Sequence, residues 1–296
     1  MTAANALRLL SLAAIWGASF LFMRIAAPAL GSVWLAGGRV LGAALFLLLC
    51  AAWLKRLLAL RVHARHFLIL GLFNSALPFW LYSHAAQHLS ASLMAILNAT
   101  APLWGALIAA LLSRQALPAR VASGLFLGVA GVALLVGLTP QQLSPPVLWA
   151  VLACLGAALC YGIASNYARG HSEVDAFSNA HGSMWAASFL LLPWLPTAVP
   201  AQMPGWDVAA AVLALGVVCS GLAYLLYFRL LAELGAAQAL TVTFLIPLFG
   251  VLWGWLFLHE PVGWHTAGGA LVVLLGTALV TGFNPRVLWR KAEVSA

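Results

Sequence analysis

The sequence has very little charge for its length. Of its 296 residues only 7% are charged, whereas 64% are hydrophobic. A soluble domain carries about a quarter charged residues, so this composition cannot supply a water-facing surface. The shortage of charge excludes an ordinary soluble protein and indicates a chain whose main solvent is lipid.

Acidic residues are the scarcest charged group. The sequence holds six, and all fall in predicted loops, at span ends or in the tail: Glu173, Asp175, Asp207, Glu233, Glu260 and Glu293. A proton-driven carrier often uses a carboxylate inside the membrane, and an intramembrane enzyme needs paired acids or a nucleophile beside a base. Neither pattern is present, so we expect no catalytic residues. Uniport, substrate exchange and proton coupling through His181 stay open.

Metal-ligand spacings and nucleotide-binding motifs are also lacking. The four cysteines all lie in apolar runs, and they are best interpreted as small apolar filler: Cys50, Cys154, Cys160 and Cys219. No GxxxxGK[ST] motif occurs, which excludes ATP hydrolysis within this chain as the driving force. We therefore expect neither a cofactor nor a metal.

The chain does contain a series of long apolar runs. A helix needs roughly 20 apolar residues to cross a bilayer, and lipid leaves backbone groups no partner outside the helix. Charges, prolines and glycines divide the chain into ten such runs, so we expect an all-α integral membrane protein. The predicted spans are 7–25, 33–54, 67–86, 91–112, 119–138, 147–168, 176–196, 207–229, 237–258 and 263–282.

Basic residues gather on alternate connections between these spans. With a cytoplasmic amino terminus, twelve of the fourteen lie on the cytoplasmic side, and outer loops such as the one from Leu138 hold none. This distribution predicts a multi-pass protein of the bacterial inner membrane with both termini in the cytoplasm. The net charge of +8 is then a topology signal and not a surface for nucleic acid. Five tryptophans fall at the predicted outer interface: Trp34, Trp149, Trp194, Trp206 and Trp264.

An apolar run that contains a proline occurs twice. The runs TAPLWGALIAALL from Thr100 and LIPLFGVLWGWLF from Leu245 place Pro102 and Pro247 145 residues apart. The same spacing relates other residues of the two halves: Gly105 and Gly250, Gly124 and Gly269, Gly131 and Gly276, Ser75 and Ser220, Tyr82 and Tyr227. Each half has five spans, so the second half enters the membrane from the opposite side, as in many secondary transporters. We expect ten transmembrane helices as two inverted-topology five-helix repeats, residues 1–144 and 145–296.

Several local motifs add a family resemblance. They are WGASF in the first span, Arg39 in the second, Pro102 in the fourth, and LHEPVGWHTAGGALVVLLG from Leu258. With ten spans in two halves, the chain resembles an EamA-type member of the drug/metabolite transporter superfamily. The resemblance implies an inner-membrane exporter of amino acids or other small metabolites. The family usually has a glutamate after the fourth span as well as at Glu260, whereas this chain has Gln115 there.

The substrate site of such a fold lies near the bilayer midplane between the repeats. Ten polar or aromatic residues within the spans are predicted to bind the substrate: Trp16, Arg39, Asn74, Ser75, Tyr82, Asn98, Thr100, Tyr161, Ser220 and Tyr224. Three prolines are predicted to kink their helices or act as hinges at this level: Pro78, Pro102 and Pro247. For each polar residue, hydrogen bonding between helices is the alternative interpretation.

Arg39 is the strongest single candidate. It lies about six residues into its span, and an arginine at depth costs roughly 2.5–3.5 kcal/mol on insertion scales. No acidic residue occurs at matching depth. Its partner is therefore expected to be a carbonyl, water or a substrate carboxylate, unless the side chain extends to the outer headgroups.

The leading functional hypothesis is an alternating-access exporter of small amphipathic metabolites. Aromatic residues in the spans favour amino acids with apolar side chains, because rings stack on apolar groups. The alternative is a flippase for lipids or lipid-linked sugars, which a lateral opening between helices would support. Substrate identity, coupling ion, direction of transport and oligomeric state stay open.

Overall fold

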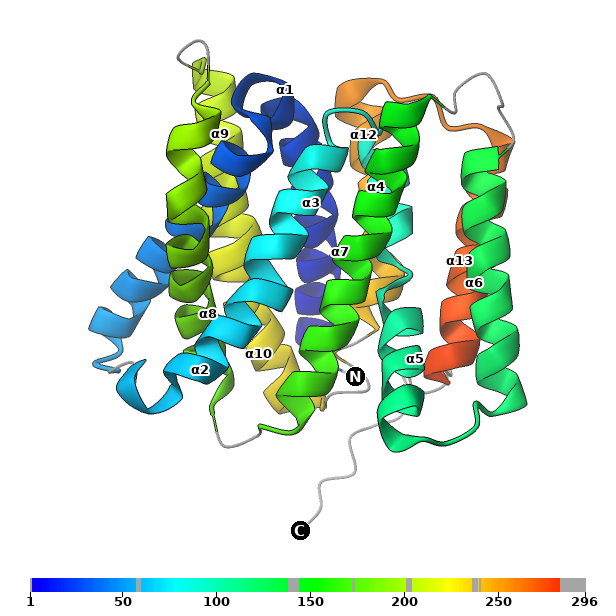
Figure 1. Cartoon of the computed structure of the whole chain (residues 1–296), viewed down its shortest axis with the longest axis horizontal. Coiled ribbons are helices and arrows are strands. Elements are labelled where there is room, and N and C mark those ends of the chain that lie inside the picture. The colour runs from blue at the N-terminus through cyan, green and yellow to red at the C-terminus, as the bar shows by residue number, and fades with distance from the viewer. Residues whose placement is uncertain are drawn as a thin grey trace.

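The computed structural model describes residues 2–56, 60–137, 144–171, 174–200, 204–235, 239 and 241–282. All regular elements in this part of the chain are helices (Figure 1). Five of them are long and apolar enough to cross a membrane: Ala4–Trp53, Ala91–Ser113, Pro145–Arg169, Trp206–Leu234 and Trp264–Thr281. The structure therefore has the character of a multi-pass membrane protein.

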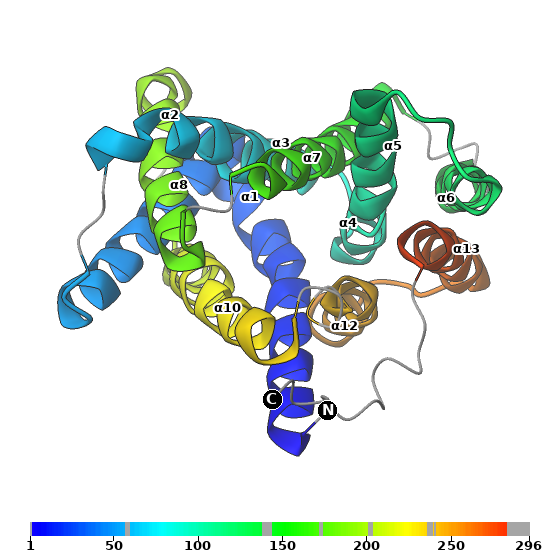
Figure 2. The same cartoon turned by 90° about the horizontal axis from the view of Figure 1, so that it is seen from below.

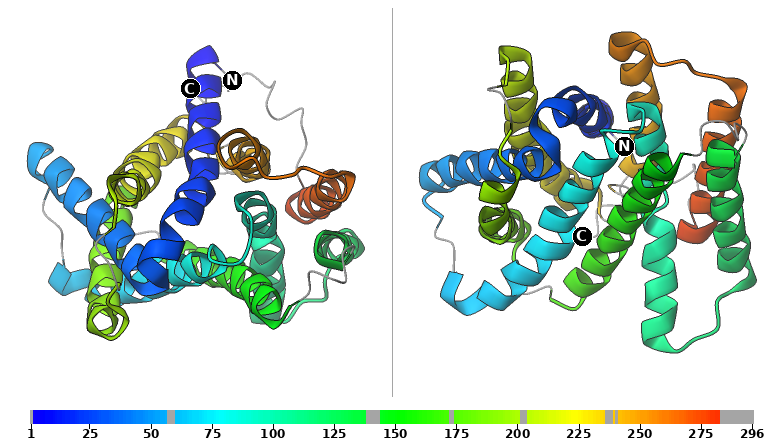
Figure 3. Two further views of the ribbon diagram at one scale, coloured as in Figure 1. Left: turned by 90° about the horizontal axis from the view of Figure 1, so that it is seen from above. Right: turned by 45° about the horizontal axis from the view of Figure 1, so that its top comes forward.

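The first two predicted spans form one long helical element, α1 (Ala3–Trp53). It changes direction at Gly31, whose backbone φ of 69° lies in the left-handed region that favours glycine. Figure 3 shows the two arms of α1 leaving this bend in different directions. Just beyond it, the indole of Trp34 donates a hydrogen bond of 2.9 Å to the carbonyl of Leu195. The two spans are thus joined by a sharp bend at a glycine, where a loop was expected.

Two spans widen into a π-helix at equivalent places. Ser75 lies in one π-helical segment and Ser220 in the other, and these residues are 145 apart. π-Helical turns are rare and are frequent at functional sites. The third predicted span is built from α2 (Leu60–Leu70), η1 (Gly71–Ala76) and α3 (Leu77–Ala85), and the eighth from α9 (Trp206–Leu213), η4 (Ala214–Leu222) and α10 (Ala223–Leu234).

The fourth span is interrupted at its middle. α4 (Ala91–Asn98) stops two residues before α5 (Ala101–Ser113), and Pro102 lies in the first turn of α5. Proline has no N–H, so the carbonyl of Asn98 lacks the donor that a continuous helix would give it. In the second half α12 (Val242–Leu258) starts one turn earlier than α5 and contains Pro247 in its interior.

α6 (Ala119–Gly137) and α13 (Trp264–Thr281) lie side by side through facing glycines (Figures 1 and 2). A Cβ built on Gly124 would lie 2.6 Å from the carbonyl oxygen of Gly276, and one on Gly131 would lie 3.1 Å from that of Gly269. Residue numbers rise along α6 as they fall along the facing α13, so the two helices are antiparallel.

A second pair of close approaches connects the halves. A Cβ on Gly17 of α1 would lie 2.9 Å from the backbone nitrogen of Gly250 in α12. A Cβ on Gly162 of α7 (Pro145–Arg169) would lie 2.9 Å from the backbone nitrogen of Gly105 in α5. Both contacts join a glycine of one half to a glycine of the other. The remaining elements are α8 (Ala176–Leu191) and the short helix η3 (Leu192–Ala198).

Candidate functional site

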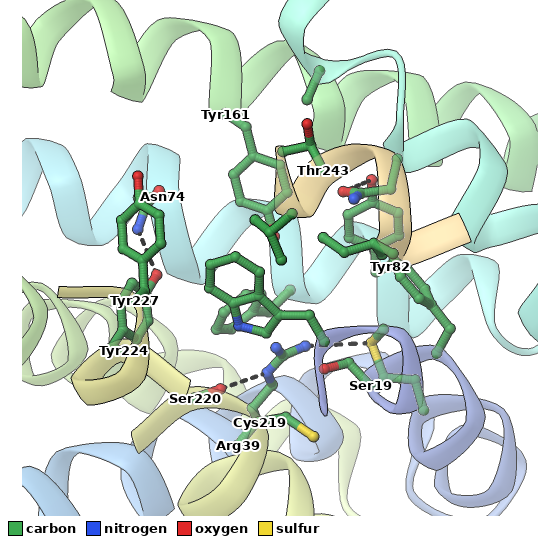
Figure 4. Close-up of a pocket in the computed structure, with 18 of the residues that line it drawn as sticks. Ser19, Arg39, Asn74, Tyr82, Tyr161, Cys219, Ser220, Tyr224, Tyr227 and Thr243 are labelled. Carbon is green, nitrogen blue, oxygen red and sulfur yellow. Dashed lines mark hydrogen bonds between the residues drawn. The ribbon is translucent and has the colours of Figure 1, made fainter. Parts of the chain in front are cut away.

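A cavity of about 280 Å³ lies among the helices and takes its wall from both halves of the chain (Figure 4). Its surface is mostly apolar and aromatic, with a few polar groups, which is the usual character of a small-molecule site. Pro102 lines it. So do eight of the ten residues that were predicted to bind the substrate: Trp16, Arg39, Asn74, Tyr82, Asn98, Tyr161, Ser220 and Tyr224.

The other predicted residues lie outside this wall. Ser75 is fully buried in η1, and its hydroxyl has no hydrogen-bond partner among the described residues. The hydroxyl of Thr100 donates to the carbonyl of Leu97 at 2.7 Å, which closes the end of α4. Pro78 and Pro247 belong to helices that contribute to the wall, but their own side chains are not part of it. None of these four residues is therefore part of the wall of this cavity.

The wall is built largely of equivalent residues from the two halves. Fourteen of its residues form seven pairs 145 positions apart: Trp16 and Tyr161, Phe20 and Ser165, Asn74 and Cys219, Phe79 and Tyr224, Tyr82 and Tyr227, Asn98 and Thr243, Ala101 and Ile246. Such a wall is expected for a cavity on the axis that relates two repeats.

Sequence reasoning missed several of these wall residues. Applying the repeat spacing to the predicted residues Asn74, Tyr82 and Tyr224 would have found Cys219, Tyr227 and Phe79 respectively. The repeat spacing was therefore the feature of the sequence that could have predicted these three residues. Other lining residues have no such signal, because their partners were not predicted either: Ser19, Phe20, Met23, Ala101, Ser165, Val242 and Ile246.

Arg39 is the one charged side chain in the described cavity wall. Its Nε donates to the hydroxyl of Ser220 at 3.0 Å, and one terminal nitrogen contacts the sulfur of Met23 at 3.6 Å. The guanidinium carbon lies 3.7 Å from the ring centroid of Phe79, a favourable cation–π distance. The protein partners of Arg39 are therefore a hydroxyl, a thioether and a ring, and no backbone carbonyl is among its described contacts.

These contacts do not provide an acceptor for every N–H group of the Arg39 guanidinium. It has five N–H groups, and two of them have an acceptor within the described residues. The side chain is buried, so it does not extend to the headgroups. Figure 4 shows it beside Ser220 and Ser19, with Tyr224 and Tyr227 to one side and Tyr82 to the other. Three N–H groups are thus left for an acceptor that enters the cavity.

Two hydrogen bonds fix polar side chains on the cavity wall. The Tyr82 hydroxyl donates to the side-chain oxygen of Asn98 at 3.0 Å, and the Asn74 amide donates to the Tyr224 hydroxyl at 2.9 Å. The Trp16 ring lies 5.5 Å from the ring of Tyr227 and 6.4 Å from that of Tyr224. An apolar group in the cavity would meet several rings, and a polar group would meet oriented amides and hydroxyls.

Two residues that were considered for other roles lie away from the cavity. His181 accepts a hydrogen bond of 3.0 Å from the indole of Trp185 in the same helix and lies outside the wall. Glu260 lies between α12 and the last helix, α13. That helix begins at Trp264, and the Glu260 carboxylate binds the start of α4.

Comparison with protein families identifies the family of this chain. The model of the EamA-like transporter family matches residues 5–137 and again residues 148–282. The chain belongs to the EamA-like transporter family. A protein named as the uncharacterized transporter YoaV of Bacillus subtilis is 22% identical over 279 residues, which cover 93% of this chain and 96% of that protein.

Two further relatives and one solved structure extend the comparison of this EamA-like transporter. The uncharacterized protein PA1977 of Pseudomonas aeruginosa is 31% identical over 67% of this chain and 68% of its own length. A probable terminal-alkyne amino-acid exporter of Streptantibioticus cattleyicolor is 26% identical over 70% of this chain and 69% of its own length. A crystal structure with 19% identity has a TM-score of 0.67 and covers 97% of this chain and 99% of that chain, a likeness of fold.

Proposed function

We propose that this EamA-like transporter exports small carboxylate-bearing metabolites, above all amino acids with apolar side chains, by alternating access. The observation that carries the proposal is Arg39, a buried cation with three N–H groups that lack an acceptor among the described residues. A carboxylate fits two parallel N–H groups of a guanidinium. The rings of Trp16, Tyr161 and Tyr224 would cover the apolar side chain.

An amino acid also carries an ammonium group, and the cavity offers it no carboxylate among its described residues. The interruption between α4 and α5 supplies another acceptor. Because Pro102 cannot donate, the backbone carbonyl of Asn98 has no helical partner, and Asn98 lines the cavity. Irregular backbone at membrane depth is tolerated where it lines such a cavity. We assign the ammonium to this carbonyl.

Alternating access is supported by the reciprocity of contacts between the halves. Gly124 and Gly269 are equivalent positions, as are Gly131 and Gly276, and each glycine of one pair meets a glycine of the other. Equivalent helices that pack antiparallel are related by an axis perpendicular to them, which lies in the membrane plane for a transmembrane protein. This arrangement favours two inverted five-helix repeats, residues 1–144 and 145–296, in the inner membrane with both termini cytoplasmic.

One relative supports the substrate class. The probable terminal-alkyne amino-acid exporter of Streptantibioticus cattleyicolor carries, by its name, an amino acid with a terminal alkyne, which is an apolar group. The aromatic wall described above is suited to a side chain of that kind. The shared family and the cavity together favour amino acids over sugars or cations.

Reconstitution into liposomes tests the proposal. Purified protein is incorporated into vesicles loaded with radiolabelled amino acids, and efflux is followed with and without a pH gradient. We expect efflux of at least one amino acid with a large apolar side chain above that of empty vesicles, and the gradient shows whether protons are coupled. Absence of efflux for the whole panel, from protein that elutes as a single folded species, would refute this function.

A lipid flippase is the second candidate, and one feature favours it. A separate apolar cavity of about 240 Å³ lies between α5, α6 and α7. Leu103 and Trp104, on its wall, directly follow Pro102 of the central cavity, so an acyl chain there would lie beside the proposed substrate site. Transfer of a fluorescent phospholipid between leaflets of the same vesicles, with no amino-acid efflux, would favour this alternative.

A further inference from the structure

Glu260 joins the two halves of the chain at one end of the molecule. One carboxylate oxygen accepts the backbone N–H of Ala91 at 2.6 Å. The other accepts the backbone N–H of Ser92 at 3.0 Å and its hydroxyl at 2.6 Å. Ala91 and Ser92 are the first residues of α4, where N–H groups have no partner within the helix. Hydrogen bonds to an ionised group are about twice as strong as neutral ones, and negative charge is favoured at a helix start.

The packing around this contact leaves no room for a side chain at two glycines of α12. A Cβ built on Gly254 of α12 would lie 2.7 Å from the hydroxyl of Ser92 and would overlap the Glu260 carboxylate. One turn earlier, a Cβ on Gly250 would overlap the side chain of Ala95. Glu260 itself is buried. α4 and the end of α12 therefore form a close contact that the carboxylate completes.

The equivalent position at the opposite end is different. Gln115 stands 145 residues before Glu260, is exposed, and makes no side-chain hydrogen bond with the described residues. The cavity wall has the same asymmetry, because Tyr82 is 2% exposed while its equivalent Tyr227 is only partly buried. Phe79 and Tyr224 differ in the same direction. The molecule is thus closed around the cavity at the Glu260 end and looser at the Gln115 end.

We propose that Glu260 is a latch that holds the cavity closed at its own end, and that breaking its contact with α4 lets this end open while the opposite end closes. The inference rests on the proposed alternating access. The lack of a carboxylate at Gln115 makes the latch one-sided, so the conformation with the Glu260 end closed is the resting state. A ligand shifts such an equilibrium only through a difference in affinity between the two conformations. The latch sets the populations of the two conformations before the ligand binds.

Distances between spin labels at both ends test the latch. In a chain whose four native cysteines are replaced by serine, one cysteine pair is placed at His88 and Trp264, which are exposed and flank the Glu260 contact. A second pair is placed at Ala119 and Ala232, exposed residues of the other end. Electron–electron resonance in lipid vesicles then gives a distance distribution for each pair.

The variants Glu260→Gln and Gly254→Ala are expected to act alike. The first removes the charge and one acceptor, and the second displaces the carboxylate by steric overlap. In both, the longer-distance population of the His88–Trp264 pair should rise about tenfold, as expected for the loss of one charge-assisted hydrogen bond. For the Ala119–Ala232 pair, the population with the shorter distance should rise by a corresponding amount. Gly268→Ala is the matched control, because a Cβ there meets nothing within 4 Å.

Two results would overturn the latch. One is an unchanged distance distribution in both variants. The other is widening at the Glu260 end without shortening at the opposite end, which is loosening of the fold and not a change of access. Gly254→Ala keeps the test valid if Glu260→Gln does not fold. The measurement needs no substrate, so its outcome is independent of the amino-acid efflux experiment that tests the proposed function.

Discussion

Arg39 combines deep burial with an incomplete set of acceptors, and this combination is what points to an anionic ligand. Hydrogen bonding to Ser220 and stacking on Phe79 fix the guanidinium in place. Burying a cation is unfavourable unless it is paired. In the described cavity wall no acidic residue provides the pair, so a substrate carboxylate would complete it.

Replacement of Arg39 is the prediction at this scale. Arg39→Ala should lower the initial rate of amino-acid efflux roughly 10- to 100-fold, since a hydrogen bond to a charged group contributes about 1.5–3 kcal/mol. Arg39→Lys should recover only part of the rate, because lysine keeps the charge but has no planar fork. Rates are measured in vesicles with equal amounts of inserted protein. Arg229→Ala, at an exposed position, is the control, and equal rates for Arg39→Ala and the native protein would remove the role.

The positions of the helices could be predicted from the sequence, but some of their bends and contacts could not. Apolar run length predicted helices where the structure has them, and the repeat spacing paired Pro102 with Pro247, because both signals are local or periodic. The bend at Gly31 was expected as a loop, since a backbone φ has no signature in hydropathy. The partner of Glu260 could not be foreseen, because 168 residues separate the carboxylate from Ser92 and only the folded chain brings them together.

The α6–α13 crossing depends on the absence of side chains at its glycines. Gly276→Ala should lower the unfolding temperature, because the new Cβ would lie 2.6 Å from the carbonyl oxygen of Gly124 and overpacking costs roughly 1–3 kcal/mol. Gly268→Ala on the same helix should have little effect, since the space around it is open. Thermal unfolding followed by intrinsic fluorescence compares the two, and equal unfolding temperatures would contradict the close packing.

The start of α8 is stabilised by Asp175 in a loop outside the spans. Its carboxylate accepts hydrogen bonds from the backbone of Phe177 and from Ser178. Partial burial alone would raise the pKa of Asp175, but the bonds from Ser178 and the charge of Arg56 together hold this pKa below its ordinary value. A carboxylate with a lowered pKa adds stability above its unfolded pKa, and this contribution is lost as the pH falls through the folded pKa.

Asp175→Ala should therefore destabilise the protein by about 1 kcal/mol at neutral pH, the usual size for loss of a helix cap. The side chain is more than half exposed, so screening keeps the charge contribution small. The difference in unfolding temperature from the native protein should shrink as the pH falls below about 4. Asp207→Ala, in the first turn of α9, is the comparison. A difference that does not change with pH would show that the charge of Asp175 contributes nothing.

At the scale of the whole molecule, the two halves meet through reciprocal contacts and line the central cavity together. The halves differ at many positions, and two unequal pairs bear on the proposals: Arg39, whose equivalent position 145 residues later is Met184, and Glu260, whose equivalent is Gln115. Two similar halves supply a common framework for opening at either end. We infer that Arg39 determines what is bound and that Glu260 determines which end is closed at rest.

The most direct test of this account is an experimental structure of the protein in a lipid nanodisc, saturated with the amino acid that it transports best. We predict two inverted halves and a ligand in the central cavity, with its carboxylate within hydrogen-bond distance of the Arg39 guanidinium and its side chain against Trp16 and Tyr161. A ligand bound elsewhere with an empty or fully packed centre, or two halves in parallel orientation, would contradict it.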